Sequence, residues 1–263
     1  MNINININES SNIDKYVFME ELGHGNFGTT YKAFDKINNS LVAIKKIKNY
    51  NFDSNEIDNL KILNEHCDKY FICLYDFIDD SSYVYIVMKY LENYNELFNL
   101  IVENIELLHI NFDKITCNLC KGLQNFHDLG FAHNDIKPEN IMVNILNGHI
   151  KYIDYGATCY KNKCIKLKVS TPAYADPLII LGKPNSDNIL INGQQSDLWA
   201  LGMVIYAIIT GSNPYFNYGT HAYIKNYEYI KDKNLSQINK FLNKHKSNII
   251  LEKLLTRGVR TLY

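Results

Sequence analysis

The sequence predicts an α+β protein in two parts, a small antiparallel β-sheet with one helix followed by a larger, mainly helical region. From Tyr16 to about Leu91, stretches rich in β-branched and aromatic residues are separated by turn residues, which is typical of strands. From Asn95 onwards, apolar residues recur mainly at helical spacing. With 263 residues, 46% of them hydrophobic, the chain is long enough to bury a sizeable core. The two patterns meet near residues 91–95 without a Pro/Gly linker, which predicts a hinge.

The individual elements follow from these local patterns. The alternating Asn and Ile residues at the start predict a frayed tail over residues 1–15 rather than an added edge strand. The strands expected in the first part are YVFMEELGHG (16–25), TTYKAFD (29–35), LVAIKKI (41–47) and YVYIVMKYL (83–91), with one helix over 54–64. In the second part we expect helices over 97–108, 112–127, 197–210, 223–231 and 249–255, and short strands over 141–143 and 150–153.

Charge and hydropathy restrict the function classes. The formal net charge of -1 gives no basic footprint for nucleic acid. The longest apolar run, Trp199 to Ile209, is shorter than the roughly 20 residues that span a bilayer. The N-terminus has no basic segment ahead of a hydrophobic stretch, so it does not read as a secretory signal. We therefore expect no nucleic-acid or membrane partner and, by default, a cytoplasmic location; the oligomeric state is not indicated.

The six cysteines are expected to be free thiols, because nothing at the N-terminus indicates export to an oxidising compartment. Cys117 and Cys120 are spaced like half of a zinc site, and Cys159 with Cys164 could supply the other half. The first pair lies in a helical pattern and the second spacing is loose. Ordinary thiols are therefore the favoured interpretation.

Three glycines, Gly23, Gly25 and Gly28, have the spacing G-x-G-x-x-G. Glycines at this spacing let backbone N–H groups approach phosphate oxygens without obstruction by a Cβ. In a dinucleotide-binding fold a helix would follow, but here Thr29 to Phe34 continue as a strand, so the Rossmann interpretation fails. The segment is either a phosphate-binding hairpin or a simple turn.

Lys45 in the strand VAIK could place an ammonium group against phosphate oxygens, although a surface lysine is the simpler interpretation. Glu56, in the helix that follows, could hold this flexible side chain extended as an ion pair. Only eleven residues separate the two, so the helix must begin almost at once. Glu65 is the alternative partner, but the segment EIDNLKIL that starts at Glu56 fits better.

The run HNDIKPEN at 133–140 is followed by DYG at 154–156 and by SDLWALG at 196–202. Together with GHGNFG, VAIK, the Glu56 helix and STPAYADP, these motifs stand in the order of the eukaryotic protein kinase family, which the chain resembles over about residues 16–255. Lys137, two residues after Asp135, and Thr171 resemble the pattern of the serine/threonine subclass. Phosphoryl transfer needs a phosphate cradle, cations, metal ligands and a carboxylate, and the sequence supplies all four.

The resemblance implies a bilobal protein kinase fold that transfers the γ-phosphoryl group of ATP to Ser or Thr hydroxyls of protein substrates. ATP and Mg²⁺ are the implied cofactors. The N-lobe is expected over about 16–88, the hinge over about 89–94 and the C-lobe over about 95–263, with the family's final C-terminal helix missing.

The resemblance also implies roles for single residues. Asp135 would orient the acceptor hydroxyl and take its proton, and Lys137 would neutralise the transferred phosphate. Asn140 and Asp154 would be the oxygen ligands of Mg²⁺, and Asp197 would anchor the backbone of the catalytic loop. The remaining implied residues are the Lys45 and Glu56 pair and a nucleotide-binding set of Leu22, Gly23, His24, Gly25, Asn26, Phe27, Gly28, Thr29, Thr30, Ala43, Lys45, Met88, Leu91 and Met142.

The chain departs from the family pattern at four places. Asn134 stands where many kinases have the Arg that receives an activation-loop phosphate, which predicts a kinase that is not switched on in that way. Tyr155 replaces Phe and adds a hydroxyl that needs a partner. Leu178 replaces a Glu that pairs with a late Arg, and the chain stops at Tyr263, before the family's last helix. Both of these changes would weaken the helical lobe.

Two other functions stay open on the sequence alone. A pseudokinase scaffold would keep the fold and bind nucleotide without phosphoryl transfer. The presence of Lys45, Asp135, Asn140 and Asp154 argues against a scaffold. The replacement of Glu by Leu178 and the missing last helix argue for it. A small-molecule phosphotransferase can share the spacing of the catalytic loop. The DIKPEN and TPAY segments favour a protein acceptor over a small molecule.

Overall fold

The structure is a computed structural model that describes residues 12–25, 28–52, 54–67, 69–161, 173–175 and 189–212. The chain divides into two compact units, Met1–Asn93 and Tyr94–Tyr263, and this division falls within the stretch expected as a hinge. The first unit holds a β-sheet with one α-helix, and the second holds the other described α-helices. The predicted α+β fold is confirmed.

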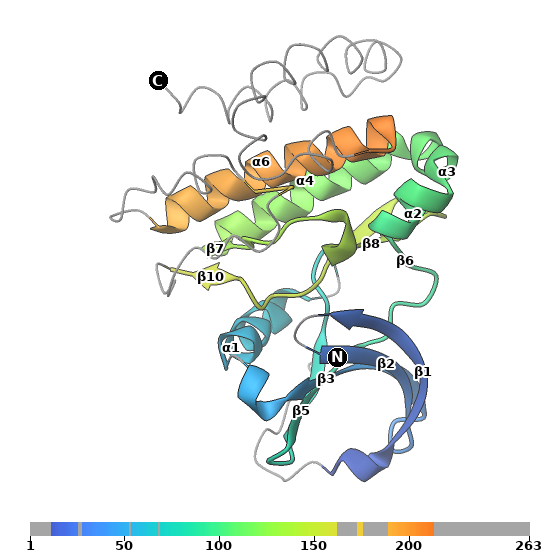
Figure 1. The fold of residues 1–263 in the computed structure, drawn as a ribbon, viewed down its shortest axis with the longest axis vertical. Helices are drawn as coiled ribbons and strands as arrows, with labels where there is room; N and C mark the ends of the chain where they lie inside the picture. The colour runs from blue at the N-terminus through green and yellow to red at the C-terminus, as the bar shows by residue number, and fades with distance from the viewer. Residues whose placement is uncertain are drawn as a thin grey trace. The chain divides into compact units, whose positions relative to one another are not determined.

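The sheet of the first unit has five strands in the order β1-β2-β3-β5-β4, and each strand is antiparallel to its neighbours (Figure 1). Its strand β4 was not predicted, because Asp76 and Asp79 interrupt the apolar pattern. Helix α1 (Ser54–Leu63) is the helix predicted at 54–64, and it packs against β4. The strands are β1 (Tyr16–Gly25), β2 (Gly28–Asp35), β3 (Ser40–Lys48), β4 (Leu74–Asp79) and β5 (Tyr83–Lys89).

The alternation of residues along β3 decides which side chains enter the core of the first unit. Val42 and Ile44 are 1% and 0% exposed, and they pack with Ala33 and Val87. Because successive residues of a strand point to opposite faces, Lys45 projects from the other face of the sheet. The VAIK motif therefore uses two residues for the core and presents its lysine on the opposite side.

The start of the described chain is ordered, so the predicted frayed tail is wrong for residues Ile13–Lys15, which form a 3-10 turn. Lys15 Nζ lies 2.7 Å from Asp76 Oδ2, and the Tyr16 hydroxyl donates to the same oxygen at 3.2 Å. These contacts tie the beginning of β1 to β4. Residues 1–11 lie outside the described residues.

The second unit combines four described α-helices with two small antiparallel sheets (Figure 1). Its longest helices, α4 and α6, lie side by side. The helices are α2 (Leu97–Glu103), α3 (Ile105–Ile110), α4 (Phe112–Asp128) and α6 (Ile189–Thr210). One sheet has the order β6-β8-β9, with β6 (Asn95–Glu96), β8 (Ile141–Asn144) and β9 (His149–Tyr152), and the other pairs β7 (Phe131–Ala132) with β10 (Cys159–Tyr160).

Two helices differ from their predicted extent. The single helix predicted over 97–108 is two helices, α2 and α3, because Asn104 has a non-helical backbone (φ -150°, ψ 49°). Helix α6 begins at Ile189 rather than at Asp197, because the polar stretch 192–196 interrupts the apolar pattern on which the prediction rests. Within this stretch, Gln194 Nε2 donates to the carbonyl oxygens of His127 and Phe131. The helices predicted over 223–231 and 249–255 lie outside the described residues.

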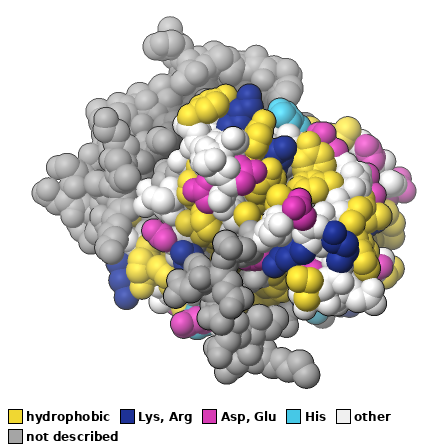
Figure 2. All heavy atoms as spheres, turned by 90° about the horizontal axis from the view of Figure 1, so that it is seen from below, with side chains coloured by type: hydrophobic (Ala, Val, Ile, Leu, Met, Phe, Trp, Pro, Cys, Tyr) yellow, Lys and Arg dark blue, Asp and Glu magenta, His cyan; other side chains and the backbone are white. Residues whose placement is uncertain are grey.

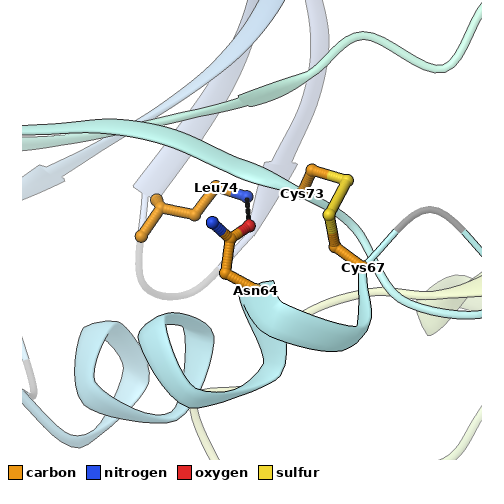
Figure 3. The surroundings of a disulfide bond; sticks show 4 residues. All are labelled: Asn64, Cys67, Cys73 and Leu74. Carbon is orange, nitrogen blue, oxygen red and sulfur yellow. Dashed lines mark hydrogen bonds between the residues drawn. A yellow bond between two sulfur atoms is a disulfide. The ribbon is translucent and has the colours of Figure 1, made fainter. Parts of the chain in front are cut away.

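The expectation of free thiols is wrong for Cys67 and Cys73, which form a disulfide (Figure 3). The connection between α1 and β4 turns back on itself and brings their Cα atoms to 4.9 Å, a separation that a disulfide spans. Cys159 on β10 is also disulfide-bonded. Cys117 and Cys120 on α4 are free thiols. Within the described ranges, no three His, Cys, Asp or Glu side chains form a group that could hold a metal ion.

The surface carries charges of both signs. On the face drawn in Figure 2, basic and acidic side chains are interspersed with hydrophobic ones. Some of the exposed hydrophobic residues, Val17, Met19 and Leu22, belong to β1. Among the helices that the structure describes, none combines the length and the hydrophobicity needed to cross a bilayer.

Candidate active site

The β1–β2 hairpin carries the three glycines of the G-x-G-x-x-G segment. Among the residues that the structure describes, a Cβ added at Gly23 would meet no heavy atom within 4 Å, and one at Gly25 would have its nearest neighbour, the Gly28 carbonyl oxygen, at 3.9 Å. A Cβ at Gly28 would collide with the carbonyl oxygen of Lys46 on β3. Strand packing therefore requires Gly28, whereas the described residues leave space beside the backbone of Gly23 and Gly25.

The two strands of this hairpin are also joined by side chains. His24 Nδ1 lies 2.7 Å from Thr29 Oγ1, so two of the residues expected at the nucleotide contact each other. This contact links the strands on either side of the tip. Asn26 and Phe27, which were also expected at the nucleotide, lie outside the described residues.

Strand β3 and helix α1 bring Lys45 and Glu56 together. Lys45 Nζ lies 2.6 Å from Glu56 Oε1, and the two side chains are 13% and 7% exposed. A charge buried to this degree is tolerated when an opposite charge accompanies it. The alternative partner, Glu65, is exposed and lies in the 3-10 turn after α1. The structure therefore pairs Lys45 with Glu56.

Three further residues expected at the nucleotide share the sheet face that carries Lys45. Thr30 lies opposite Lys45 in the β2–β3 ladder, and Ala43 lies opposite Met88 in the β3–β5 ladder. Residues directly opposite each other in a ladder project from the same face. The structure places the other three on β1 (Leu22), just after β5 (Leu91) and, in the second unit, on β8 (Met142).

The loop 133–140, between β7 and β8, gathers three of the predicted catalytic and metal-binding residues. Lys137 Nζ lies 2.9 Å from Asp135 Oδ2, and Asn140 Nδ2 donates to the same oxygen at 2.9 Å. Asn140 Nδ2 also donates to the Asp135 carbonyl oxygen at 2.8 Å. The Asp135 carboxylate is thus held by two donors in a fixed orientation while it keeps 11% exposure.

Asp197 on α6 anchors this loop through its backbone. Its carboxylate accepts the His133 backbone N–H at 2.7 Å and the Asn134 backbone N–H at 2.8 Å. His127 Nε2 lies 2.9 Å from the same carboxylate. Asp197 is 1% exposed, and these partners compensate for the burial of its charge. Sequence reasoning missed His127, because its position at the end of α4 belongs to none of the motifs.

The DYG segment (154–156) follows β9 in the chain. Asp154 has a φ of 61°, in the left-handed region that Asp adopts more readily than most residues. The Tyr155 ring is 1% exposed, and its centroid lies 5.7 Å from that of His133. The Tyr155 hydroxyl donates to the Tyr152 carbonyl oxygen at 2.5 Å. The hydroxyl added by the Tyr-for-Phe replacement therefore has a partner.

Asn134 connects the catalytic loop to the chain that follows DYG. Its φ is 62°, which Asn tolerates, and its Nδ2 donates to the Ala157 carbonyl oxygen at 3.1 Å. Helix α6 comes close at Gly193, where a Cβ would lie 2.7 Å from Asn134 Oδ1. The residue that replaces the family's Arg thus makes a neutral hydrogen bond to the beginning of the activation segment.

Glu96 on β6 is an acidic residue near the catalytic loop that sequence reasoning missed. Burial raises the pKa of Glu96, and the neighbouring Glu139 carboxylate raises this pKa further, while Lys137 lowers it. The three charged groups therefore interact. The only sequence signal for Glu96 is its position just before α2, which by itself indicates no chemistry.

Asn140 and Asp154 fit the ligand chemistry of Mg²⁺. Asn140 is 5% exposed, and the two hydrogen bonds from its Nδ2 to Asp135 leave Oδ1 as the acceptor atom of the amide. Amide and carboxylate oxygens are the ligands that hard divalent cations prefer. The donor set therefore agrees with the metal that the motifs imply.

A family model described as the protein kinase domain matches residues 16–258, which is most of the chain. This chain belongs to the protein kinase family. The match includes both units of the kinase domain, so it covers the glycine hairpin, Lys45 and the catalytic loop alike.

Several curated kinases are similar to this kinase domain. The probable serine/threonine-protein kinase FMP48 of Saccharomyces cerevisiae is 32% identical over 219 residues, which are 74% of this chain and 59% of FMP48. The SNF1-related protein kinase catalytic subunit alpha KIN12 of Arabidopsis thaliana is 29% identical over 210 residues, 77% of this chain and 41% of KIN12. The cAMP-dependent protein kinase type 3 of Saccharomyces cerevisiae is 26% identical over 252 residues, 94% of this chain and 60% of that protein. The chain spans less than two thirds of the length of each of these relatives.

Proposed function

We propose that this chain is a protein kinase that transfers the γ-phosphoryl group of ATP to Ser or Thr hydroxyls of protein substrates. The observation that carries the proposal is the fixed Asp135 carboxylate, with Lys137 and Asn140 as its donors. A carboxylate held in this way can orient an acceptor hydroxyl and take its proton, and the Lys137 ammonium can neutralise charge on the phosphoryl group. A relative named as a serine/threonine kinase supports this acceptor class.

The nucleotide phosphates would be bound by backbone groups, by a lysine side chain and through a bound metal ion. In the first unit, the open backbone at Gly23 and Gly25 can approach phosphate oxygens, and Lys45, held by Glu56, supplies a cation. In the second unit, Asn140 and Asp154 would hold Mg²⁺, which neutralises phosphate charge when it is bound.

We further propose that the kinase is active without a phosphate on its activation loop. Asn134 carries no charge that could bind such a phosphate, and its amide already donates to the Ala157 carbonyl oxygen. Its backbone N–H is held by Asp197. Protein treated with a phosphatase, and shown by mass spectrometry to carry no phosphate, should keep its transfer rate. A tenfold or greater fall in the rate would contradict this proposal.

The experiment that tests the main proposal is phosphate transfer from Mg-ATP to a panel of generic proteins and, in parallel, to small-molecule acceptors, with the acceptor residues of the proteins located by mass spectrometry. Asp135→Ala and chelation of the metal are the controls. Transfer to Ser or Thr that disappears in both controls supports the proposal. Transfer only to small molecules would favour a small-molecule phosphotransferase, and nucleotide binding without any transfer would favour a scaffold.

A further inference from the structure

We propose that the Cys67–Cys73 disulfide is a redox site that sets the position of Glu56 and thereby the affinity for nucleotide. The inference rests on the proposed function only in its nucleotide readout. The disulfide joins the chain that leaves helix α1 to the chain that enters strand β4 (Figure 3). Both ends of this link lie in the first unit.

One end of the link leads to Glu56. Helix α1 continues directly into the 3-10 turn Asn64–His66, and Cys67 is the next residue. A helix transmits a displacement of its end along its axis because its backbone hydrogen bonds keep it rigid. Glu56, near the start of α1, must reach Lys45 at 2.6 Å, so a shift of α1 away from β3 would separate the pair.

The other end of the link leads to β5, which carries Met88, one of the residues expected at the nucleotide. The Cys73 carbonyl oxygen accepts the Lys89 backbone N–H at 2.9 Å, and Leu74 lies opposite Met88 in the β4–β5 ladder. Cys73 is therefore fixed to the end of β5. The disulfide consequently connects the helix that carries Glu56 to the strand that carries Met88.

A hydrogen bond joins the same two segments of the chain that the disulfide links. Asn64 Oδ1 accepts the Leu74 backbone N–H at 2.8 Å, and Figure 3 shows it beside the two sulfur atoms. This bond keeps the chain near its place after reduction, but a hydrogen bond exchanges with water and a covalent bond does not. Reduction should therefore loosen α1 without unfolding the unit.

The chemistry of the switch is thiol–disulfide exchange with a dithiol. Cys67 is half-buried and Cys73 is 7% exposed, so Cys67 is the more exposed residue of the two and its Sγ is the atom that the incoming thiolate attacks in this proposal. The Cys67–Cys73 bond breaks, and Cys73 leaves as a thiolate that takes a proton. The second thiol of the dithiol then displaces Cys67 as a thiol. The two electrons come from the dithiol, which becomes a disulfide.

The test compares the full chain, purified without reductant, before and after treatment with dithiothreitol. We expect reduction to weaken Mg-ATP binding by about fivefold or more and to speed amide hydrogen exchange across α1. Cys67→Ser should show both properties without dithiothreitol and should not respond to it. The double variant Cys117→Ser/Cys120→Ser, which changes the free thiols on α4, should respond like the unmodified chain.

Several outcomes would overturn the proposal. Alkylation of both Cys67 and Cys73 in the unreduced protein would mean that the disulfide does not form. An equal response of Cys67→Ser and the unmodified chain would assign the effect to the Cys159 disulfide. If Cys67→Ser does not fold, graded reduction of the unmodified chain decides: the change in exchange across α1 must follow the alkylated fraction of Cys67. Amide hydrogen exchange across α1 does not depend on phosphoryl transfer. A chain that transfers no phosphate can therefore still show, or fail to show, the proposed effect of reduction on α1.

Discussion

Lys45 and Glu56 are both nearly buried, and each charge is tolerated because the other accompanies it. We expect Glu56→Gln to raise the KM for ATP about tenfold, because Lys45 loses the carboxylate that holds its side chain towards α1. A double-mutant cycle of Lys45→Met and Glu56→Gln, measured by denaturant unfolding, should give a coupling free energy of about 1–3 kcal/mol. The control is the pair Lys32 and Glu20, whose glutamate is 56% exposed and which should therefore show a much weaker coupling. Equal coupling in the two pairs would contradict this account.

Asn134 is predicted to position the activation segment through its amide. Asn134→Asp keeps the shape and the tolerance of a positive φ but replaces the donor to the Ala157 carbonyl oxygen with an acceptor. We expect kcat/KM for a protein substrate to fall about tenfold, which corresponds to about 1.4 kcal/mol. Asn118 makes the same type of bond, to the Gly148 carbonyl oxygen at 2.8 Å, so Asn118→Asp is the control. A similar loss of kcat/KM in both variants would mean that Asn134 only stabilises the fold and does not position the activation segment.

Glu96 should make stability depend on pH. Burial, and then the Glu139 carboxylate, raise its pKa above the ordinary value of 4.5, so the folded state disfavours the charged form. The unfolded chain loses this proton at lower pH than the folded chain, and stability therefore falls as pH rises through the interval between the two pKa values. We expect Glu96→Gln to raise Tm relative to the unmodified chain at pH 7, with a gain that vanishes near about pH 4. A gain of the same size at both pH values would contradict this explanation.

At the scale of elements, the sequence predicted those whose pattern comes from burial. The run of apolar and β-branched residues in β3 and the helical spacing in α4 both reflect burial, and both elements lie where they were expected. Strand β4 was missed because Asp76 interrupts the apolar pattern. Asp76 is present there because it accepts hydrogen bonds from Lys15 and Tyr16. The two-residue strands β7 and β10 are too short to carry a pattern and exist because they pair with each other.

In its second turn, at Gly193, helix α6 packs closely against β7 and the catalytic loop. Gly193 allows the close approach, because a Cβ there would lie 2.7 Å from Asn134 Oδ1 and 2.8 Å from Ala132 Cβ. We expect Gly193→Ala to lower the free energy of unfolding by about 1–3 kcal/mol, even though Ala favours helices. Gln195, exposed on the same helix, provides the control: Gln195→Ala should change stability by less than about 0.5 kcal/mol. A stabilising Gly193→Ala would refute the close approach.

At the scale of the whole molecule, the order of the motifs was the strongest sequence signal. That order predicted the kinase family, and the family model matches residues 16–258. Interactions that depend on tertiary proximity could not be predicted in this way. The Cys67–Cys73 disulfide requires the connection between α1 and β4 to turn back, and His127 reaches Asp197 only because α4 and α6 lie side by side. Neither the disulfide nor the His127–Asp197 contact produces a periodic pattern of residues in the sequence.

The central claim is that Asp135 serves phosphoryl transfer, and its most direct test is a comparison of the unmodified chain with Asp135→Asn. The substitution keeps the size of the side chain that Lys137 and Asn140 hold, but an amide cannot take the acceptor's proton. The kcat for transfer from Mg-ATP to Ser or Thr should fall by about 10²–10⁴-fold, while the Kd of Mg-ATP changes by less than about twofold. Equal kcat values for the two proteins would contradict the claim.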